Sequence, residues 1–359
     1  MDIDFLIIGA GIAGLSVAAE LSTLGHVLVL EGEDAPGYHA SGRSAALFDG
    51  NYGAAPVVAL SEASLPELQA GDGLLSERGI MFVAAAHQAV EFAGLVSDHQ
   101  LQVLNFEQAA KRVPLLKPGA VAFAGYTDQA WDIDTDRMLQ GYARVLRAAG
   151  GRVECRQHVN AITRVAEGWQ VRTVSGAEYR ARNIVNAAGA WADQLAVMAG
   201  IKPIGITAMR RSMARIPAPG GLDVKSWPMV VAVDMSFYCK PDAGSLIVSP
   251  AEEDLVEPQD AWADDMVLAE GLARYEEMVT EPVTRLESSW AGLRSFAPDE
   301  VLVLGPSLQD ERFVWAAGQG GYGFQTAPAA ARLIADLVAG RVPELAPDMV
   351  RALSANRFG

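Results

Sequence analysis

Residues 1–31 read MDIDFLIIGAGIAGLSVAAELSTLGHVLVLE, and this stretch decides the fold. An apolar run at 5–8 meets the glycine turn GAGIAG at 9–14, and a helical pattern then leads to a second apolar run at 27–30 that ends on Glu31. Strand, glycine turn, helix, strand and acid in this order are typical of a dinucleotide-binding β–α–β unit. The alternative, a glycine-rich turn without a ligand, does not account for both flanking strands and the closing acid.

Each glycine of this turn has its own steric role. Gly9 allows the tight turn, Gly11 lets the backbone approach a pyrophosphate, and Gly14 lets the helix lie close to the strands. Ile12 and Ala13 stand at the start of the helix. Free N–H groups and a partial positive charge at that end favour phosphate binding.

Glu31 lies 22 residues after Gly9, at the end of the second strand. A carboxylate at this place accepts hydrogen bonds from a ribose diol, and it disfavours the 2′-phosphate of NADP. We therefore expect Glu31 and the following Gly32 to contact a dinucleotide.

The overall composition limits the classes of partner. The chain has 359 residues, which favours two domains over one, and its formal net charge is −16. So acidic a protein is a poor match for nucleic acid or for an anionic membrane surface, whereas a local arginine pair can still bind an anionic substrate. We expect a small-molecule substrate and no nucleic-acid partner.

The cysteines and the first strand bear on metal content and compartment. Cys155 and Cys239 form no C-x-x-C or Cys/His cluster, so we expect no metal site. They provide no disulfide framework, which fits a reducing cytoplasm. The first strand begins by Phe5 and leaves no room for a signal peptide. No apolar stretch reaches the length of about 18 residues that suggests a membrane helix, so we expect a cytoplasmic protein without an integral membrane segment.

The order of elements along the chain predicts an α/β fold in which one domain interrupts another. Proline-rich sequence with isolated strands between 204 and 288 indicates a mostly antiparallel sheet, and the α/β pattern returns after it. We assign 1–78, 130–203 and 289–359 to a nucleotide-binding domain, and 79–129 together with 204–288 to a substrate-binding domain.

Four short strands follow the glycine pair at 150–151. Residues 152–155, 161–166, 169–174 and 177–181 alternate with turn signals and predict one antiparallel meander.

Two arginines lie in apolar or small-residue surroundings where a free charge is costly. Arg211 follows Arg210 in a predicted strand, so one of the two should point inward. Arg294 lies in the apolar segment WAGLRSF. A buried guanidinium needs a planar anionic partner, and a substrate carboxylate fits its fork. The alternative is an internal ion pair with one of the many acids.

Further candidates are polar groups near these segments. Tyr238 and Tyr52 could present hydroxyls to a pocket, although either could equally be a core ring with its hydroxyl at the surface. His39 lies in the loop after Glu31, where it could contact a cofactor or be solvated. The glycine-rich loop 318–323 precedes a helix and could approach a ring system closely.

Taken together, the sequence resembles the FAD-dependent D-amino-acid oxidase/glycine oxidase superfamily over essentially its whole length. Within it, the chain is most similar to the bacterial D-arginine dehydrogenase type. The resemblance rests on the glycine turn with Glu31, the loop 37–44, and the segments 185–189, 290–294 and 318–323.

The resemblance implies a Rossmann-like FAD-binding domain of the glutathione-reductase type, with an inserted α+β substrate domain on an antiparallel sheet. It implies noncovalent FAD and oxidative deamination of D-amino acids to 2-oxo acids and ammonia, by hydride transfer to flavin N5. It matches Arg211 and Arg294 to the carboxylate-binding arginines and Tyr238 and Tyr52 to their hydroxyl partners. The residues that we expect to bind FAD are Gly9, Gly11, Ile12, Ala13, Gly14, Glu31, Gly32, Ser41, Gly42, Arg43, Ser44, Ala188, Gly189, Gly320, Gly321, Tyr322, Gly323 and Gln325.

The sequence departs from the D-arginine type in its substrate pocket. The D-arginine enzymes place an acid on the strand near Ile80, and this strand has none here. Leu47 and Asp49 stand where that group has a histidine and a threonine. A guanidinium side chain would lose its counter-charge, so we expect tolerance for apolar or aromatic D-amino acids instead. His39 is an alternative point of covalent FAD attachment.

Two other functions stay open. One is oxidation of glycine, sarcosine or another N-methyl amine on the same scaffold. The other is a non-catalytic or electron-transfer flavoprotein subunit. For an enzyme of amino-acid catabolism, the electron acceptor would be a quinone, another carrier or oxygen.

Overall fold

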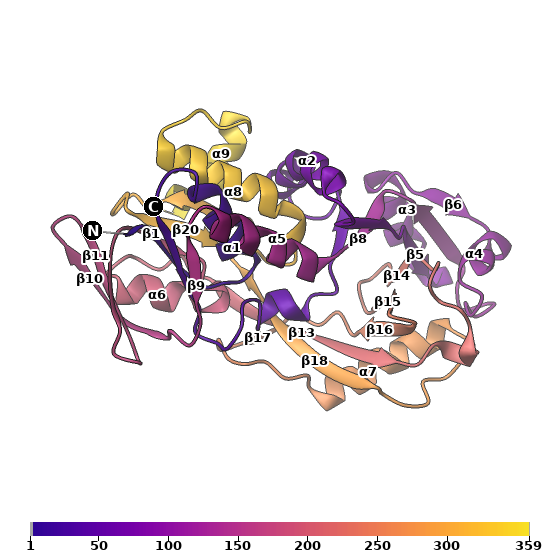
Figure 1. Cartoon of the computed structure of the whole chain (residues 1–359). Coiled ribbons are helices and arrows are strands. Elements are labelled where there is room, and N and C mark those ends of the chain that lie inside the picture. Colours follow the sequence, from indigo (N-terminus) through magenta and orange to yellow (C-terminus); the bar gives the residue numbers. More distant parts are fainter. Residues whose placement is uncertain (1–2, 359) are drawn as a thin grey trace.

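The computed structural model describes residues 3–358 and shows an elongated molecule with a large sheet toward each end (Figure 1). At one end β1 (Ile3–Ile8), α1 (Ile12–Leu21) and β2 (Val27–Leu30) form the expected β–α–β unit. Strand β1 pairs in parallel with β2 and with β12 (Glu178–Asn186). The predicted α/β fold is confirmed.

The sheet around β1 has eight strands in the order β10-β11-β12-β1-β2-β9, with β20 beside β12 and β19 beside β20. Its further strands are β9 (Arg152–Glu154), β10 (Val159–Val165), β11 (Gly168–Thr173), β19 (Val303–Pro306) and β20 (Phe313–Ala317). The meander prediction is correct for β10, β11 and β12, which pair antiparallel. It is wrong for β9, which runs parallel to β2 at the sheet edge because α5 (Thr135–Ala148) brings the chain back in the same direction.

Helices cover both faces of this sheet because successive side chains point to opposite sides. Phe5 and Ile7 lie in the hydrophobic cluster that includes α1 and α8 (Gly323–Ala339). Leu6 and Ile8 lie in the cluster that includes α6 (Ala192–Met198). The nucleotide-binding half is therefore a sheet between two helical layers.

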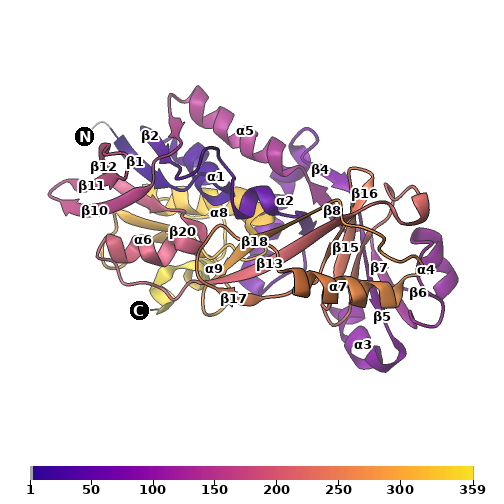
Figure 2. The same cartoon turned by 90° about the horizontal axis from the view of Figure 1, so that it is seen from below.

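The second sheet has nine strands in the order β17-β13-β16-β15-β14-β5-β7-β6, with β18 on the other edge of β13. Its strands are β5 (Ile80–Ala84), β6 (Gln102–Leu104), β7 (Phe123–Thr127), β13 (Thr207–Ile216), β14 (Met229–Ala232), β15 (Tyr238–Asp242), β16 (Ser245–Ser249), β17 (Asp254–Val256) and β18 (Ser288–Phe296). Its helices are α3 (Ala89–Asp98), α4 (Phe106–Arg112) and α7 (Asp265–Met278). Figure 2 shows the long strand β13 running from this sheet toward the nucleotide-binding half.

A small sheet and a helix lie between the two halves. Strand β8 (Ala130–Ile133) pairs with β3 (Leu47–Asp49) and with β4 (Leu75–Glu77). The helix α2 (Ala55–Ala70) packs against α8. A shorter helix, α9 (Pro347–Leu353), follows near the C-terminus. No helix within 3–358 combines the length and the apolar character needed to span a bilayer.

The glycine turn is as tightly packed as its sequence predicts. A Cβ on Gly14 would lie 1.8 Å from the carbonyl oxygen of Gly9, and a Cβ on Gly9 would lie 2.3 Å from the carbonyl oxygen of Ala187. Both obstacles are backbone atoms, which a rotamer change cannot move. The close approach of α1 to β1 and β12 therefore requires glycine at both positions.

The substitution Gly14→Ala tests this packing. We expect a loss of about 1–3 kcal/mol in the free energy of unfolding, because the methyl group forces α1 away from the strands. The matched control is Gly141→Ala in α5, where an added Cβ meets nothing within 4 Å. That change should stabilise the protein by about 0.5–1 kcal/mol. Thermal unfolding of both variants gives the comparison, and equal effects would contradict the packing argument.

Candidate functional site

A cavity of about 670 Å³ extends from the glycine turn of the first sheet to strands of the second sheet. Its size is that of a typical cofactor or ligand pocket. Gly9, Gly11 and Glu31 line one end, and Arg211 and Arg294 line the cavity from β13 and β18. Residues about 280 positions apart in the sequence thus share one space.

The end at the glycine turn has the chemistry of a phosphate site. Gly11 precedes the first turn of α1, and the cavity reaches its backbone. The Ser41 hydroxyl accepts a hydrogen bond from the Ile12 N–H at 3.0 Å. Gly11 itself has no side chain that could cover this end of α1. The helix therefore directs its positive end at this part of the cavity.

Glu31 ends β2 with its carboxylate held in place by backbone groups. One oxygen accepts from the Ala10 N–H at 2.8 Å, and the other accepts from the Glu33 N–H at 3.0 Å. The side chain is almost buried and lines the cavity. A carboxylate in this place suits a ribose diol, so the glycine turn and Glu31 fit the adenosine half of FAD.

Three lining residues at this end were missed from the sequence. Gln157, His158 and Val159 follow β9, which ends at the same edge of the sheet as β2 because the two strands are parallel. A Cβ on Gly32 would lie 3.2 Å from the imidazole Nε2 of His158. A parallel interpretation of 152–154 would have identified them, since ligands bind at the carboxyl ends of such strands.

Most other residues expected to bind FAD line the same cavity. Ile12, Ala13, Gly32, Ser41, Arg43, Ser44, Ala188, Gly189, Gly320, Gly321, Gly323 and Gln325 all do. Gly14, Gly42 and Tyr322 are outside its lining and shape it from behind. Gly42 donates its N–H to the Gly37 carbonyl at 2.6 Å, and the Tyr322 ring packs on Tyr52 at 5.0 Å. Burial raises the pKa of Tyr322 to about 12.

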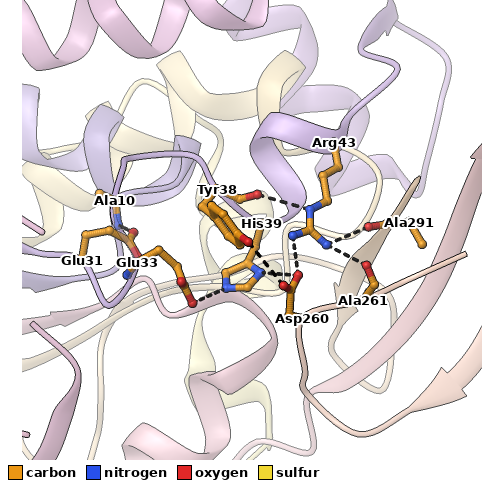
Figure 3. Close-up of polar contacts among 9 residues, drawn as sticks. All are labelled: Ala10, Glu31, Glu33, Tyr38, His39, Arg43, Asp260, Ala261 and Ala291. Carbon is orange, nitrogen blue, oxygen red and sulfur yellow. Dashed lines mark hydrogen bonds and ion pairs between the residues drawn. The ribbon is translucent and has the colours of Figure 1, made fainter. Parts of the chain in front are cut away.

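Arg43 connects the loop 37–44 to segments next to the second sheet (Figure 3). Its guanidinium donates to the carbonyls of Ala261 at 2.8 Å and Ala291 at 3.0 Å, and to the Asp260 carboxylate at 2.5 Å. The hydrogen bond from Arg43 lowers the pKa of Asp260 below its ordinary value. Arg43 therefore joins three segments that are far apart in the sequence.

His39 lies beside this cluster with its own partners. Its Nε2 is 3.0 Å from the Glu33 carboxylate (Figure 3). Its ring packs on Trp191 with 4.8 Å between the ring centroids. The ring also lines the cavity.

The register of β13 and β18 brings the two arginines together. Met209 pairs with Arg294, and Arg211 pairs with Gly292. Arg211 and Arg294 are thus diagonal neighbours on one face of the antiparallel ladder. Arg211 is the inward member of its pair, at 4% exposure, while Arg210 forms an ion pair with Asp254.

The two arginines have an internal partner and also unused donors. The Nη2 of Arg211 lies 2.7 Å from the Glu253 carboxylate, and the Nη1 of Arg294 lies 3.7 Å from the same oxygen. An internal ion pair therefore exists. Yet the Nε and Nη1 of Arg211 are buried without a hydrogen-bond partner within residues 3–358. Buried donors of this kind call for a further acceptor.

The two tyrosines adjoin the arginine pair. Tyr52 accepts a hydrogen bond from the Arg294 Nη1 at 3.3 Å, and the Tyr238 ring lies 5.9 Å from the Arg211 guanidinium. Burial opposes the charge of Arg294, but Tyr52, Tyr238 and Glu253 outweigh it and raise its pKa. Tyr238 points its hydroxyl to the Met213 sulfur at 3.4 Å.

Beyond the arginine pair, the cavity wall is mainly apolar. Ile80, Phe82 and Val231 belong to one buried cluster and line the cavity. Two polar residues on this wall are His99 and Asp49, whose Nδ1 and carboxylate oxygen are 3.7 Å apart. Burial raises the pKa of Asp49.

Asp49 is an acid near β5, the strand in which the sequence contains none. It pairs with Ala130 in the small sheet, and the carbonyl of Ala130 accepts from the Gly79 N–H at 2.9 Å, directly before Ile80. The acid thus comes from β3, a contact that the sequence of β5 could not reveal.

Comparisons with known proteins identify the family of the chain. The family model described as FAD dependent oxidoreductase matches residues 4–337. An L-2-hydroxyglutarate dehydrogenase from Escherichia coli O17:K52:H18 is 24% identical over 217 residues, which are 56% of this chain and 50% of that protein. The chain thus spans about half the length of that relative.

Two solved structures have the same fold. Glycine oxidase from Geobacillus kaustophilus superposes with a TM-score of 0.83 at 23% identity, covering 99% of this chain and 98% of the other. L-proline dehydrogenase from P. horikoshii gives a TM-score of 0.82 at 21% identity, with the same coverage of 99% and 98%. At these identities the likeness concerns the fold.

Replacing Arg43 tests its role as a connection. Arg43→Ala would leave the carbonyls of Ala261 and Ala291 without their donor, which should cost about 2–3 kcal/mol of unfolding free energy. Asp260→Asn should cost less, because the half-exposed carboxylate can turn to water. Thermal unfolding of the FAD-loaded variants measures both. A larger loss for Asp260→Asn would show that the ion pair, and not the carbonyl contacts, dominates.

Proposed function

We propose, for a chain that belongs to the FAD-dependent oxidoreductase family, that it oxidises the Cα–N bond of an α-amino acid, preferentially a D-amino acid. The observation that carries the proposal is the arginine pair Arg211 and Arg294, which shares one cavity with the glycine turn. The products would be a 2-oxo acid and ammonia after hydrolysis of the imino acid. The more specific likeness to D-arginine dehydrogenases belongs to this proposal as well.

The residues at the other end of the cavity fit FAD. The α1 N-terminus would hold the pyrophosphate, Glu31 the ribose, and the loops around Ser41 and Gly320 would contact the rest of the molecule. FAD supplies a two-electron acceptor when bound. The protein's own contribution is to bind the substrate and hold its Cα in a fixed position, which is a positioning task.

The substrate carboxylate would bind the unsatisfied donors of Arg211 together with Arg294. A guanidinium offers several N–H groups in one plane, which match a carboxylate. Tyr52 already contacts Arg294 and would hold that side chain in place. Tyr238, buried beside Arg211, would add a hydroxyl to the same site.

The mainly apolar wall suits apolar or aromatic side chains. Ile80 and Phe82 offer no charge to a substrate, and the Asp49 carboxylate lies 3.7 Å from the His99 imidazole. These observations support amino acids with apolar or aromatic side chains, such as D-phenylalanine, as substrates.

Other substrates of the same scaffold define the decisive experiment. Glycine and N-methyl amines need no side-chain pocket, and the E. coli relative is named for a hydroxy acid. An anaerobic panel of D- and L-amino acids, glycine, sarcosine and 2-hydroxy acids, read by bleaching of the flavin absorbance, separates them. We expect bleaching by D-amino acids. Bleaching only by hydroxy acids would overturn the proposal, and no bleaching by any compound would support a non-catalytic subunit.

Adjacent arginines provide a matched test of the carboxylate site. Arg211→Ala should raise KM for the amino acid by about a hundredfold or more, because a buried charged hydrogen bond is lost. Arg210→Ala changes the same residue type one position away, on the side chain that pairs with Asp254, and should leave KM within about threefold. FAD content and melting temperature of both variants serve as folding controls. Equal KM values would remove Arg211 from the site.

The pH dependence tests the chemistry of the amine. A protonated amine lacks the lone pair that oxidation of the Cα–N bond requires, so kcat/KM should rise from neutral to alkaline pH. A profile that is flat over this range would contradict amine oxidation.

A further inference from the structure

Glu253 is an acid placed at a site that would bind an anion. Its carboxylate is 2.7 Å from Arg211 and 3.7 Å from Arg294, yet the residue is outside the cavity lining and its side chain is 53% exposed. It therefore contacts the arginine pair from a solvent-exposed position outside the cavity lining.

The backbone holds Glu253 in this place. On one edge of β13, β17 pairs with residues 208–210 and β16 pairs with residues 214–216, which leaves a gap around Ser212. The loop 250–253 fills it. The Glu252 carboxylate accepts from the Ser212 N–H at 2.6 Å, and the Ser249 hydroxyl donates to the Ser212 carbonyl at 2.8 Å.

These anchors separate Glu253 from an ordinary surface acid. Glu252 is bound to the strand directly before it, and β17 begins directly after it at Asp254. The chain therefore cannot carry Glu253 far from Arg211, and only its side chain is free to move. The backbone therefore keeps a negative charge near the arginine pair.

The charge changes what the pair attracts. Glu253 lowers by one unit the positive charge that the two guanidiniums present to a ligand, in addition to the effect of Glu252, whose carboxyl also interacts with Arg211. Arg211 keeps unsatisfied donors for a carboxylate. A plain carboxylate carries one net negative charge and is repelled by Glu253, whereas an amino acid is a zwitterion with no net charge and is little affected.

We propose that Glu253 is a specificity-determining residue that makes the arginine pair prefer zwitterionic amino acids over plain carboxylates of the same shape. The inference rests on the proposed function, and it concerns binding rather than the later oxidation. Glu253 acts through the charge of Arg211 and Arg294 and not by touching the substrate.

The test compares two ligands of one shape in the FAD-loaded protein. The ligands are D-phenylalanine, measured by anaerobic flavin reduction, and 3-phenylpropionate, measured by titration of the flavin absorbance. In Glu253→Gln the dissociation constant of 3-phenylpropionate should fall about tenfold, while that of D-phenylalanine should change less than about threefold. The difference between the wild-type protein and Glu253→Gln should shrink at high salt, because Glu253 is half exposed and salt screens its charge.

Two further variants serve as controls. Glu253→Asp keeps the charge and should keep the wild-type ratio of the two constants. Asp254→Asn removes a neighbouring charge that pairs with Arg210, a residue that does not line the cavity. This variant should also keep the wild-type ratio. An unchanged ratio in Glu253→Gln would overturn the inference and leave Glu253 as a surface ion pair.

The failure of the proposed function is distinguishable from this result. If D-phenylalanine and the other amino acids fail to reduce the wild-type flavin, the proposed function is wrong. If they reduce it and the ratio does not depend on Glu253, only the inference is wrong.

Discussion

The register between β13 and β18 is the constraint on which the site depends. Side chains alternate along a strand, so a slip of one residue would send Arg211 or Arg294 to the opposite face of the ladder. The pairing extends from Thr207 with Phe296 to Arg215 with Ser288, and this length fixes it. Gly292, opposite Arg211, adds no side chain there, and a Cβ in its place would lie 3.4 Å from the Cβ of Arg43.

The two ends of the cavity differ in how they are built. The nucleotide end is local, because the glycine turn and Glu31 belong to one β–α–β unit. The substrate end is assembled from distant strands, and Arg43 connects the two ends through Asp260, Ala261 and Ala291. The geometry between the ends therefore depends on contacts across more than two hundred positions of the chain.

This difference explains what the sequence could predict. The glycine turn was predictable because the spacing of its glycines alone determines which close backbone contacts are possible. Arg211 was predictable because an arginine that points inward from a strand is unusual. The parallel direction of β9 was not predictable, because the sequence of a short strand does not indicate its direction. The position of Glu253 was not predictable either. In the sequence it is one of three consecutive acids, and only the gap on the edge of β13 shows where it lies. The position of Asp49 likewise became clear only from the pairing of β3 with β8 and the hydrogen bond from Gly79 to Ala130.

The chain crosses between the two large sheets four times within residues 3–358, because β5–β7 and β13–β18 interrupt the strands of the first sheet. A recombinant hybrid that exchanged one half for that of a relative would need a junction at each crossing. Exchange of the single block β13–β18 would carry both arginines but leave the wall residues of β5 behind. Point changes on the loops and strands around the cavity are the simpler route by which such a protein diversifies.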